Sequence, residues 1–328
     1  FLPSGGLDSK GLLHRGPERR HMSIKVLQPG VLTTVQDLGR YAYQDVGMPV
    51  NGAMDPEACR LANKLVGNHN DEAVLECTLI GGSYEFCQDT CFAITGADMP
   101  ALLNHTPCIR GRAYLAGKGD VLTLQMARSG CRSYLAIYGG FTVPPVMGSR
   151  STNLKAGIGG YCGRALQAGD LLPTAKAPVP PGGLPDLHCS QPDYPSSVLL
   201  HVIEGSQATR FTASGLQSFY GEPYRVSEQS DRMGCRMDGP AITSINGTDI
   251  LSDGIAFGSI QVTPAGQPII LMADRQTTGG YAKIGTVCRT DLAAVAQCRP
   301  GTTVHFRKIS VQDAQKLLLA KEERFHEL

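Results

Sequence analysis

The sequence predicts a mainly β protein with a few short helices. Glycine and proline are abundant, at 39 and 21 of 328 residues, which is typical of a chain with many tight turns. The apolar segments are short and are bounded by these two residue types. Helix-capping patterns occur at only two places. A hydrophobic content of 42% is enough for a folded core, and the length favours two domains.

The domain boundaries follow from two stretches of unusual composition. Residues 1–21 are polar and patternless and end at His21, directly before Met22, so we expect them to be vector-derived. Seven prolines lie between 173 and 195, which predicts an extended connector over 173–196. The connector separates a first β-barrel domain, 22–172, from a second, 197–328.

The individual elements follow in chain order. Short β-branched or aliphatic runs predict strands at 24–27, 73–79, 91–95, 121–124, 133–137, 198–203, 259–262, 269–272 and 303–306. Asp55 as N-cap with Pro56 at the first helical position predicts a helix over 57–66. Ser310, with Asp313 three residues later, predicts a C-terminal helix. Glycine turns precede alternating strands in both halves, which favours two related barrels or sandwiches.

Charge and cysteine content exclude several classes of function. The formal net charge is +1, which argues against a dedicated nucleic-acid or anionic-membrane binder. Without a signal-peptide pattern or an unbroken apolar run, neither secretion nor membrane spanning is expected. The eleven cysteines are odd in number and contain no Cys-x-x-Cys pair, so we expect free thiols in a cytoplasmic protein and no metal site.

Familiar nucleotide motifs fail in their spacing. The glycine-rich segment 157–163 has Cys162 where a dinucleotide fingerprint needs its third glycine, and 111–118 has one residue too many for a phosphate loop. The chain also lacks the Met-Lys-Met signature of biotin attachment. No nucleotide cradle is therefore predicted in this chain.

Two polar, glycine-rich blocks in the first half are candidate sites, because such side chains need partners when they are buried. The first block includes Gln36, Asp37 and Arg40; it is either part of a site or a salt-bridged turn that sets the strand order. The second contains Arg150, Ser151, Thr152 and Asn153. We expect an anion or carboxamide pocket there, with a loop satisfied by its own side chains as the alternative.

The second half contributes Arg232, Asp274, Gln276, Thr277 and Lys283. Asp274 follows an apolar strand, so the backbone should hold its carboxylate rigidly while leaving it accessible. Lys283 follows a glycine turn, which is expected to bring its side chain back to face Asp274. Such a pair can shuttle protons or orient an amide, or it can be a buried structural ion pair. We expect one small-molecule site between the halves, with Asp274 and Lys283 as its catalytic pair.

Taken together, these blocks resemble one family. The sequence is similar to the biotin-dependent carboxyltransferases, also called allophanate hydrolase subunit 2, in segments 28–40, 51–55, 60–68, 149–153, 230–234 and 272–280. The resemblance implies tandem cyclophilin-like barrels.

Within the family, the sequence resembles the free-standing members that serve as one subunit of a 5-oxoprolinase. This resemblance implies ATP-dependent opening of 5-oxoproline to glutamate, together with subunit-A-like and subunit-B-like partners, and we expect the chain to be inactive alone. Because no phosphate loop is evident, ATP is expected on a partner. Two alternatives stay open: a carboxyltransferase subunit for urea or a related small amide, and a regulatory antagonist that binds a kinase-inhibitor protein.

Overall fold

The structure is a computed structural model that describes residues 23–175, 180, 183–184 and 187–327. The expected vector-derived segment, 1–21, lies outside these residues, as do parts of the expected connector. The described chain is mainly β with four α-helices, which confirms the predicted fold class.

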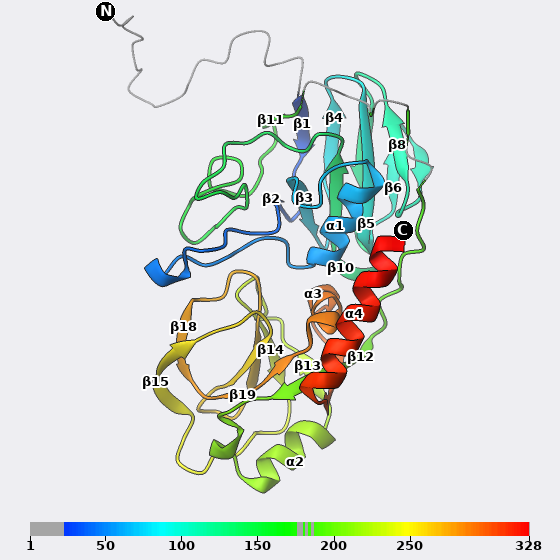
Figure 1. Ribbon diagram of the computed structural model, residues 1–328. Coiled ribbons are helices and arrows are strands. Elements are labelled where there is room, and N and C mark those ends of the chain that lie inside the picture. The colour runs from blue at the N-terminus through cyan, green and yellow to red at the C-terminus, as the bar shows by residue number, and fades with distance from the viewer. Residues whose placement is uncertain (1–22, 176–179, 181–182, 185–186, 328) are drawn as a thin grey trace, which may run out of the picture.

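The strands of the first half form two sheets, in the upper part of Figure 1. One sheet has the order β11-β1-β4-β9-β6-β7, with bounds Leu171–Pro173, Ser23–Gln28, Ser83–Phe86, Val121–Leu124, Ala101–Leu103 and Thr106–Cys108. The other has the order β2-β3-β10-β5-β8, with bounds Leu32–Gln36, Val74–Thr78, Ser129–Ile137, Thr90–Asp98 and Ala113–Ala116. Side chains of both sheets, such as Ile24, Phe86, Leu75 and Ile94, meet in one buried core.

The second half is a closed barrel, in the lower part of Figure 1. Its order is β12-β19-β16-β17-β14-β13-β20, with bounds Ser197–Glu204, Lys283–Val287, Ser259–Val262, Pro268–Leu271, Gly234–Asp238, Tyr224–Val226 and Thr303–Lys308. β12 and β20 pair in parallel and the other neighbours pair antiparallel. A separate two-stranded ribbon joins β15 (Asp249–Gly254) to β18 (Thr278–Tyr281).

Both predicted helices are present. In α1 (Pro56–Leu65), the Asp55 side chain accepts a hydrogen bond from the Ala58 N–H, as its N-cap position predicts. The C-terminal helix α4 (Val311–Glu327) begins after Ser310, whose hydroxyl accepts a hydrogen bond from the Asp313 N–H. Two helices were not predicted, α2 (Ala213–Gly221) and α3 (Leu292–Gln297). Across the described residues, no helix is both long and apolar enough to cross a lipid bilayer.

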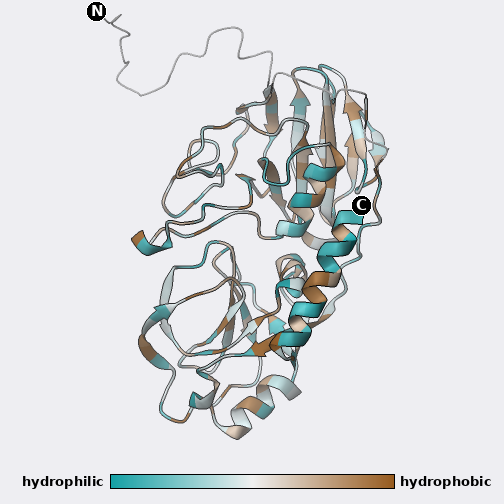
Figure 2. Cartoon of the chain, in the orientation of Figure 1, coloured by the Kyte–Doolittle hydropathy of each residue, from teal (hydrophilic) through white to brown (hydrophobic). Residues whose placement is uncertain are grey.

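Helix α4 connects the two halves. It starts beside the barrel and ends beside α1, and it carries alternating hydrophilic and hydrophobic bands (Figures 1 and 2). Arg60 of α1 makes a bidentate ion pair with Glu322 at 2.8 Å and stacks on the Phe325 ring. These contacts hold the C-terminal helix against the first half, although its sequence follows the barrel.

The face of the five-stranded sheet that is turned away from this core carries a few buried polar side chains among the apolar ones that pack on α1. Because side chains alternate along a strand, Val35 and Leu75 enter the core between the sheets, and their neighbours Thr34 and Glu76 point the other way. Glu76 is only 1% exposed. A buried carboxylate on this face requires partners from outside the sheet.

Candidate functional site

Two segments of the first half form the near side of the candidate site. The Arg40 N–H donates to the Val50 carbonyl at 2.7 Å, so 37–40 and 50–53 lie side by side. Gly52 has φ +91°, and a Cβ there would lie 2.9 Å from the Gly39 nitrogen. Asn51 takes a left-handed conformation, φ 57°, which asparagine tolerates better than most residues. The close approach of the two segments places the Asn51 side chain at the junction of the halves.

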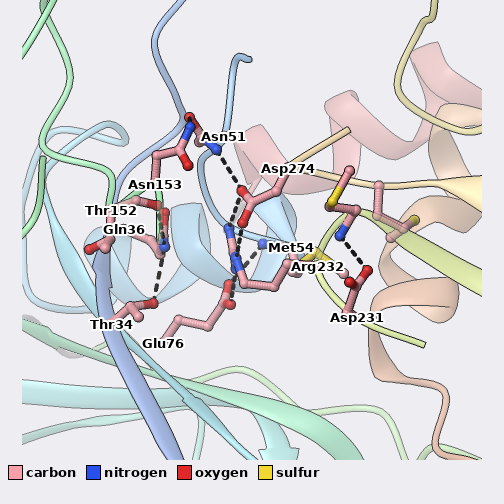
Figure 3. Close-up of polar contacts among 12 residues, drawn as sticks. Thr34, Gln36, Asn51, Met54, Glu76, Thr152, Asn153, Asp231, Arg232 and Asp274 are labelled. Carbon is pink, nitrogen blue, oxygen red and sulfur yellow. Dashed lines mark hydrogen bonds and ion pairs between the residues drawn. The ribbon is translucent and has the colours of Figure 1, made fainter. Parts of the chain in front are cut away.

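Asn51 bonds directly to Asp274 across this junction (Figure 3). Its Nδ2 donates to Asp274 Oδ1 at 2.7 Å. Its Oδ1 accepts from Arg40 Nη1 at 2.6 Å and from Asn153 Nδ2 at 3.2 Å. Asp274 follows β17 and is 12% exposed. Two of the sequence-predicted residues of the first half, Arg40 and Asn153, therefore reach Asp274 through Asn51.

Arg232 is the cation of the site. Its Nε donates to Asp274 Oδ2 at 2.9 Å, its Nη1 contacts Glu76, and its Nη2 donates to the Gly52 carbonyl at 2.6 Å (Figure 3). Burial alone would lower the pKa of Arg232, but the Glu76 and Asp274 carboxylates outweigh burial and raise it. A guanidinium that is only 5% exposed therefore stays charged and neutralises two carboxylates from different halves.

Local backbone structure aims Arg232 at the first half. The Asp231 carboxylate accepts hydrogen bonds from the Met233 and Gly234 N–H groups at 2.8 and 3.0 Å, which fixes the turn before β14. The Asp274 N–H donates to the Arg232 carbonyl at 2.9 Å. The two residues of the ion pair are thus held side by side by their own backbones.

A second buried network extends from Glu76 toward α3. Glu76 Oε2 accepts from the Met54 N–H and the Tyr134 hydroxyl, both at 2.8 Å. Tyr134 in turn accepts from the Asp55 N–H, and the Asp55 carboxylate accepts from Gln297 Nε2 at 2.9 Å. Burial raises the pKa of Asp55 to about 6. This network fixes Glu76, and through it Arg232, from the side opposite Asp274.

Asp37 is a structural anchor. Its Oδ1 accepts from the Ser149 and Ser151 hydroxyls, and its Oδ2 accepts from the Arg150 N–H. Arg40 donates Nη2 to the Ser151 carbonyl at 2.7 Å, and burial lowers its pKa. The salt-bridged turn considered for Asp37 and Arg40 is wrong, because both bind the 149–151 loop and form no ion pair with each other.

Lys283 lies away from Asp274, so the expected pairing of these two residues is wrong. Its Nζ donates to Asp253 and to the Gly254 carbonyl, at 2.5 and 2.6 Å, at the end of the β15–β18 ribbon. Both oxygens of Asp274 are instead bonded to Arg232 and Asn51. The predicted glycine turn is also wrong: Gly279 and Gly280 lie within β18, so the chain runs on to Lys283 at the start of β19 and does not fold back toward Asp274.

The remaining predicted residues do not bond to Asp274: some hold the backbone near the site, and others lie outside the network. The Arg150 guanidinium donates to the Val143 carbonyl at 3.1 Å and lies 4.0 Å from Glu72, on the far side of its loop. Thr152 donates its hydroxyl to the Val35 carbonyl. Gln276 is exposed, and neither it nor the half-buried Thr277 makes a side-chain hydrogen bond to any described residue.

Gln36 lies beside this cluster with one atom unsatisfied. Its Nε2 donates to Thr34 Oγ1 at 3.0 Å and to the Thr152 carbonyl at 3.3 Å, but its buried Oε1 has no partner among the described residues (Figure 3). A buried amide oxygen without a partner is costly unless a ligand or water satisfies it. Gln36 therefore keeps an unused hydrogen-bond acceptor near Asn153.

Two residues of the site were not predicted as site residues, Asn51 and Glu76. Asn51 stood in a polar segment next to a glycine, and Glu76 was a single acid inside an apolar strand. A charge at such a position signals a buried partner, so Glu76 could have been found from the sequence. The partner itself, Arg232, lies 156 residues away.

A cavity of about 460 Å³ is lined in part by Asn51, the residue that bonds to Asp274, and by Arg275, which follows Asp274 in the chain. It is enclosed by the 38–53 segment, the start of α1, the Phe257 and Arg275 side chains, the 286–293 segment and α4. Its size lies within the usual range of small-molecule sites, roughly 300–1,000 Å³. Asn51 thus contributes both to the ion-pair network and to the wall of a cavity.

The glycine-rich segment 157–163 does not form a phosphate cradle. A Cβ at Gly159 would lie 2.1 Å from the Ser151 carbonyl oxygen, and one at Gly160 would lie 1.9 Å from Thr152 Oγ1. A Cβ at Gly163 would lie 1.9 Å from the Gly157 carbonyl oxygen. These glycines allow the chain to pack on itself, so their presence does not point to a bound phosphate.

Within the described ranges, no group of three or more His, Cys, Asp or Glu side chains has the arrangement of a metal site.

A family model for the carboxyltransferase domain, subdomains A and B, matches residues 46–308. Among curated proteins, the chain is 38% identical over 308 residues to the C subunit of 5-oxoprolinase from Escherichia coli, covering 93% of this chain and 97% of that protein. It is also 38% identical to the protein of the same name from Haemophilus influenzae, covering 90% and 94%. The "urea amidolyase" of Lachancea kluyveri is 32% identical, but the match covers 17% of its length.

The solved structures agree with these matches. The K. lactis urea amidolyase superposes with a TM-score of 0.84 at 29% identity, covering 92% of this chain and 20% of that protein. The Kluyveromyces lactis urea carboxylase gives the same TM-score and identity, with 29% of its length covered. The fold is thus shared with one domain of much longer enzymes.

Proposed function

This chain belongs to the carboxyltransferase domain family, and on that premise we propose that it is the C subunit of a 5-oxoprolinase, a hydrolase that works with partner subunits. The observation that carries the proposal is the combination of identity and length. The chain matches the 5-oxoprolinase subunits over nearly their whole length, whereas it matches about a sixth of the urea amidolyases at lower identity.

The hydrogen-bonding capacity left at the junction supports an amide ligand. Asn51 Nδ2 uses one of its two N–H groups on Asp274, so the second can donate to a substrate carbonyl. Asp274 Oδ2 accepts one hydrogen bond, from Arg232, and has a further lone pair for a substrate N–H. A lactam presents one carbonyl and one N–H, which is the complementary pattern. The two side chains would bind and orient this group beside the Asn51 wall of the cavity.

The contact with Arg232 determines what the Asp274 carboxylate can do in the reaction. Ring opening adds water across the lactam C–N bond, so the nitrogen gains a proton and the carbonyl carbon gains an oxygen. A carboxylate held by Arg232 and Asn51 is fixed in position and ready to accept the substrate N–H. Asp274 is therefore the residue of this chain that we place closest to the reacting amide.

ATP, which this reaction consumes, is proposed to bind a partner subunit. The glycines of 157–163 are occupied by the chain's own backbone, and the Arg150 guanidinium is turned toward Val143. Both observations support a nucleotide site elsewhere in the complex.

A cytoplasmic location is part of the proposal. The eleven cysteines are all free, as predicted, which fits a reducing compartment.

Reconstitution tests the proposal. The purified chain, a subunit-B-like protein and a subunit-A-like protein are combined with ATP and 5-oxoproline, and glutamate is measured. We expect glutamate from the complete set and none from this chain alone. We also expect a stable complex with the subunit-B-like protein by size-exclusion chromatography with light scattering. Absence of glutamate from the complete, assembled set would refute the proposed activity.

Carboxyl transfer to urea or a related small amide is the second candidate. The TM-score of 0.84 to two urea-processing enzymes favours it, because the same junction would serve any carboxamide. Adding urea and a carboxybiotin carrier to the chain separates the two, since only the second candidate consumes carboxybiotin. Stable binding of the subunit-B-like protein without turnover of either substrate would indicate the regulatory alternative.

A further inference from the structure

Arg275 stands apart from the other buried arginines. Four arginine side chains in the described chain are buried: Arg40, Arg132, Arg232 and Arg275. Arg132 and Arg232 have Glu76 within 4.0 Å, and each nitrogen of the Arg40 guanidinium has an acceptor. Arg275 is 9% exposed and has no carboxylate within 4.0 Å among the described residues.

The contacts of Arg275 leave much of its donor capacity unused. Nε donates to the Ile255 carbonyl and Nη1 to the Met272 carbonyl, both at a long 3.3 Å. The guanidinium carbon lies 5.4 Å from the centre of the Phe257 ring. Nη2 has no hydrogen-bond partner in the part of the chain that the structure describes. Burial lowers the pKa of Arg275, but a guanidinium remains protonated at neutral pH.

Arg275 and Asn51 both line the 460 Å³ cavity. Among the other charges on the wall, Arg60 pairs with Glu322 at 2.8 Å and Lys321 with Glu57 at 2.6 Å, and Arg289 is exposed to solvent rather than buried. Much of the remaining wall is apolar, including Leu38, Val50, Phe257, Val287, Leu292 and Leu318. Arg275 is therefore a buried positive charge without a counter-ion on the wall of a mostly apolar cavity.

We propose that Arg275 binds the carboxylate of a small amide acid in this cavity, with the amide directed toward Asn51 and Asp274. The proposal rests on the proposed function and adds its specificity-determining residue. A planar guanidinium with free N–H groups matches a carboxylate, and the low dielectric of an apolar wall strengthens the pairing. 5-Oxoproline carries a carboxylate next to its lactam, whereas urea carries none. Arg275 thus selects the acid among carboxamides.

A pair of ligands tests this on the unmodified protein. 5-Oxoproline and 2-pyrrolidinone share the lactam and differ in the carboxylate. Binding to the full chain, alone and with its reconstituted partners, is measured by calorimetry. We expect 5-oxoproline to bind at least about 10-fold more tightly, the effect of one charge-assisted contact. Equal affinity for the two, or no binding of 5-oxoproline to either preparation, would overturn the proposal.

Variants assign the effect to the residue. Arg275→Gln keeps an N–H donor for the two carbonyls and removes the charge, so we expect it to reduce 5-oxoproline affinity about 10- to 100-fold and to leave 2-pyrrolidinone affinity nearly unchanged. The matched control is Arg225→Ala, which removes an exposed arginine of β13 that lies outside the cavity wall. An equal loss of 5-oxoproline affinity in the control would refute the assignment. If Arg275→Gln unfolds, the ligand pair on the wild-type protein still decides.

The turnover assay separates this inference from the proposed function. If the complex opens 5-oxoproline and 2-pyrrolidinone with similar kcat/KM, the function stands and the Arg275 proposal fails. If 5-oxoproline binds in an Arg275-dependent way but the complete complex releases no glutamate, the carboxylate site stands and the proposed activity fails.

Discussion

Two aspartate–cation pairs in the second half arise from similar polar, glycine-rich sequence but lie in very different surroundings. Asp274 pairs with Arg232 at the junction of the halves, where the two side chains are 12% and 5% exposed. Asp253 pairs with Lys283 at the end of the β15–β18 ribbon, where Asp253 is 53% exposed. The first pair also contacts Asn51 and Glu76 of the first half, and the second contacts only its own neighbourhood.

The difference shows that burial, more than the residue types, determines how much an ion pair matters to the stability of the protein. When an exposed ion pair forms, each charge gives up contacts with water and gains a contact of similar strength with its partner. Such a pair therefore contributes little to stability. A buried charge has no water to return to, so the loss of a partner is costly. The following four predictions test that contrast, from the largest expected effect to the smallest.

The largest effect is expected for Asp274→Asn on turnover. Asparagine preserves the shape but removes the charge that we propose to orient the substrate amide, so we expect the reconstituted activity to fall by about 10²–10⁴. The variant should remain folded, because Glu76 still neutralises Arg232. Turnover per folded molecule and the melting temperature are measured on the same sample. Near-normal specific activity together with a large fall in melting temperature would refute the chemical role.

Arg232→Met should have the largest effect on stability. It leaves Glu76 and Asp274 without their cation, and we expect the free energy of unfolding to fall by about 3–5 kcal/mol. Urea denaturation measures the change. Adding Glu76→Gln to the variant removes one uncompensated charge and should restore part of the loss. A double variant less stable than Arg232→Met would contradict this electrostatic account.

The Asp55 carboxylate is buried, and no cationic side chain of the described residues lies within ion-pair distance of it. Burial raises its folded-state pKa to about 6, above the value of about 4 for an unfolded chain, so folding favours the protonated form. Its stabilising effect is complete below pH 4 and is lost as the pH rises through 6, by roughly 3 kcal/mol. The check is urea denaturation of the wild type and Asp55→Asn from pH 4 to 7. Asparagine can still cap α1, so parallel stability curves for the two proteins would rule out the titration.

Lys283→Met should have the smallest effect. Because its partner Asp253 is exposed, we expect the melting temperature to change by no more than about 2 °C. Since Lys283 and Asp274 are not paired, turnover in the reconstituted complex should also stay within about threefold of the wild type. A loss of turnover comparable to that of Asp274→Asn would restore Lys283 to the catalytic role that the sequence suggested.

Much of the fold was predictable because its signals are local. Strands with several consecutive β-branched or aliphatic residues, such as β3 and β10, stand out from their turns, and the Asp55–Pro56 pattern marks the start of α1. Short strands such as β6 and β7 were missed, since three residues carry no readable alternation. Helix α3 was missed because its six residues are mostly alanine, leucine and valine without a capping side chain.

The sequence by itself determined that polar blocks must be satisfied and that Asp274 is held rigidly after an apolar strand. Only the tertiary structure decided which groups satisfy them. The partners of the site are far apart in sequence: Asn51 and Asp274 are separated by 223 residues, and Arg232 and Glu76 by 156. Alternation and turn patterns report on neighbours within a few residues and say nothing about such pairings. Asp274 therefore binds Arg232 and Asn51 rather than Lys283, because the packing of the barrel on the five-stranded sheet, and not proximity in the chain, brings those groups together.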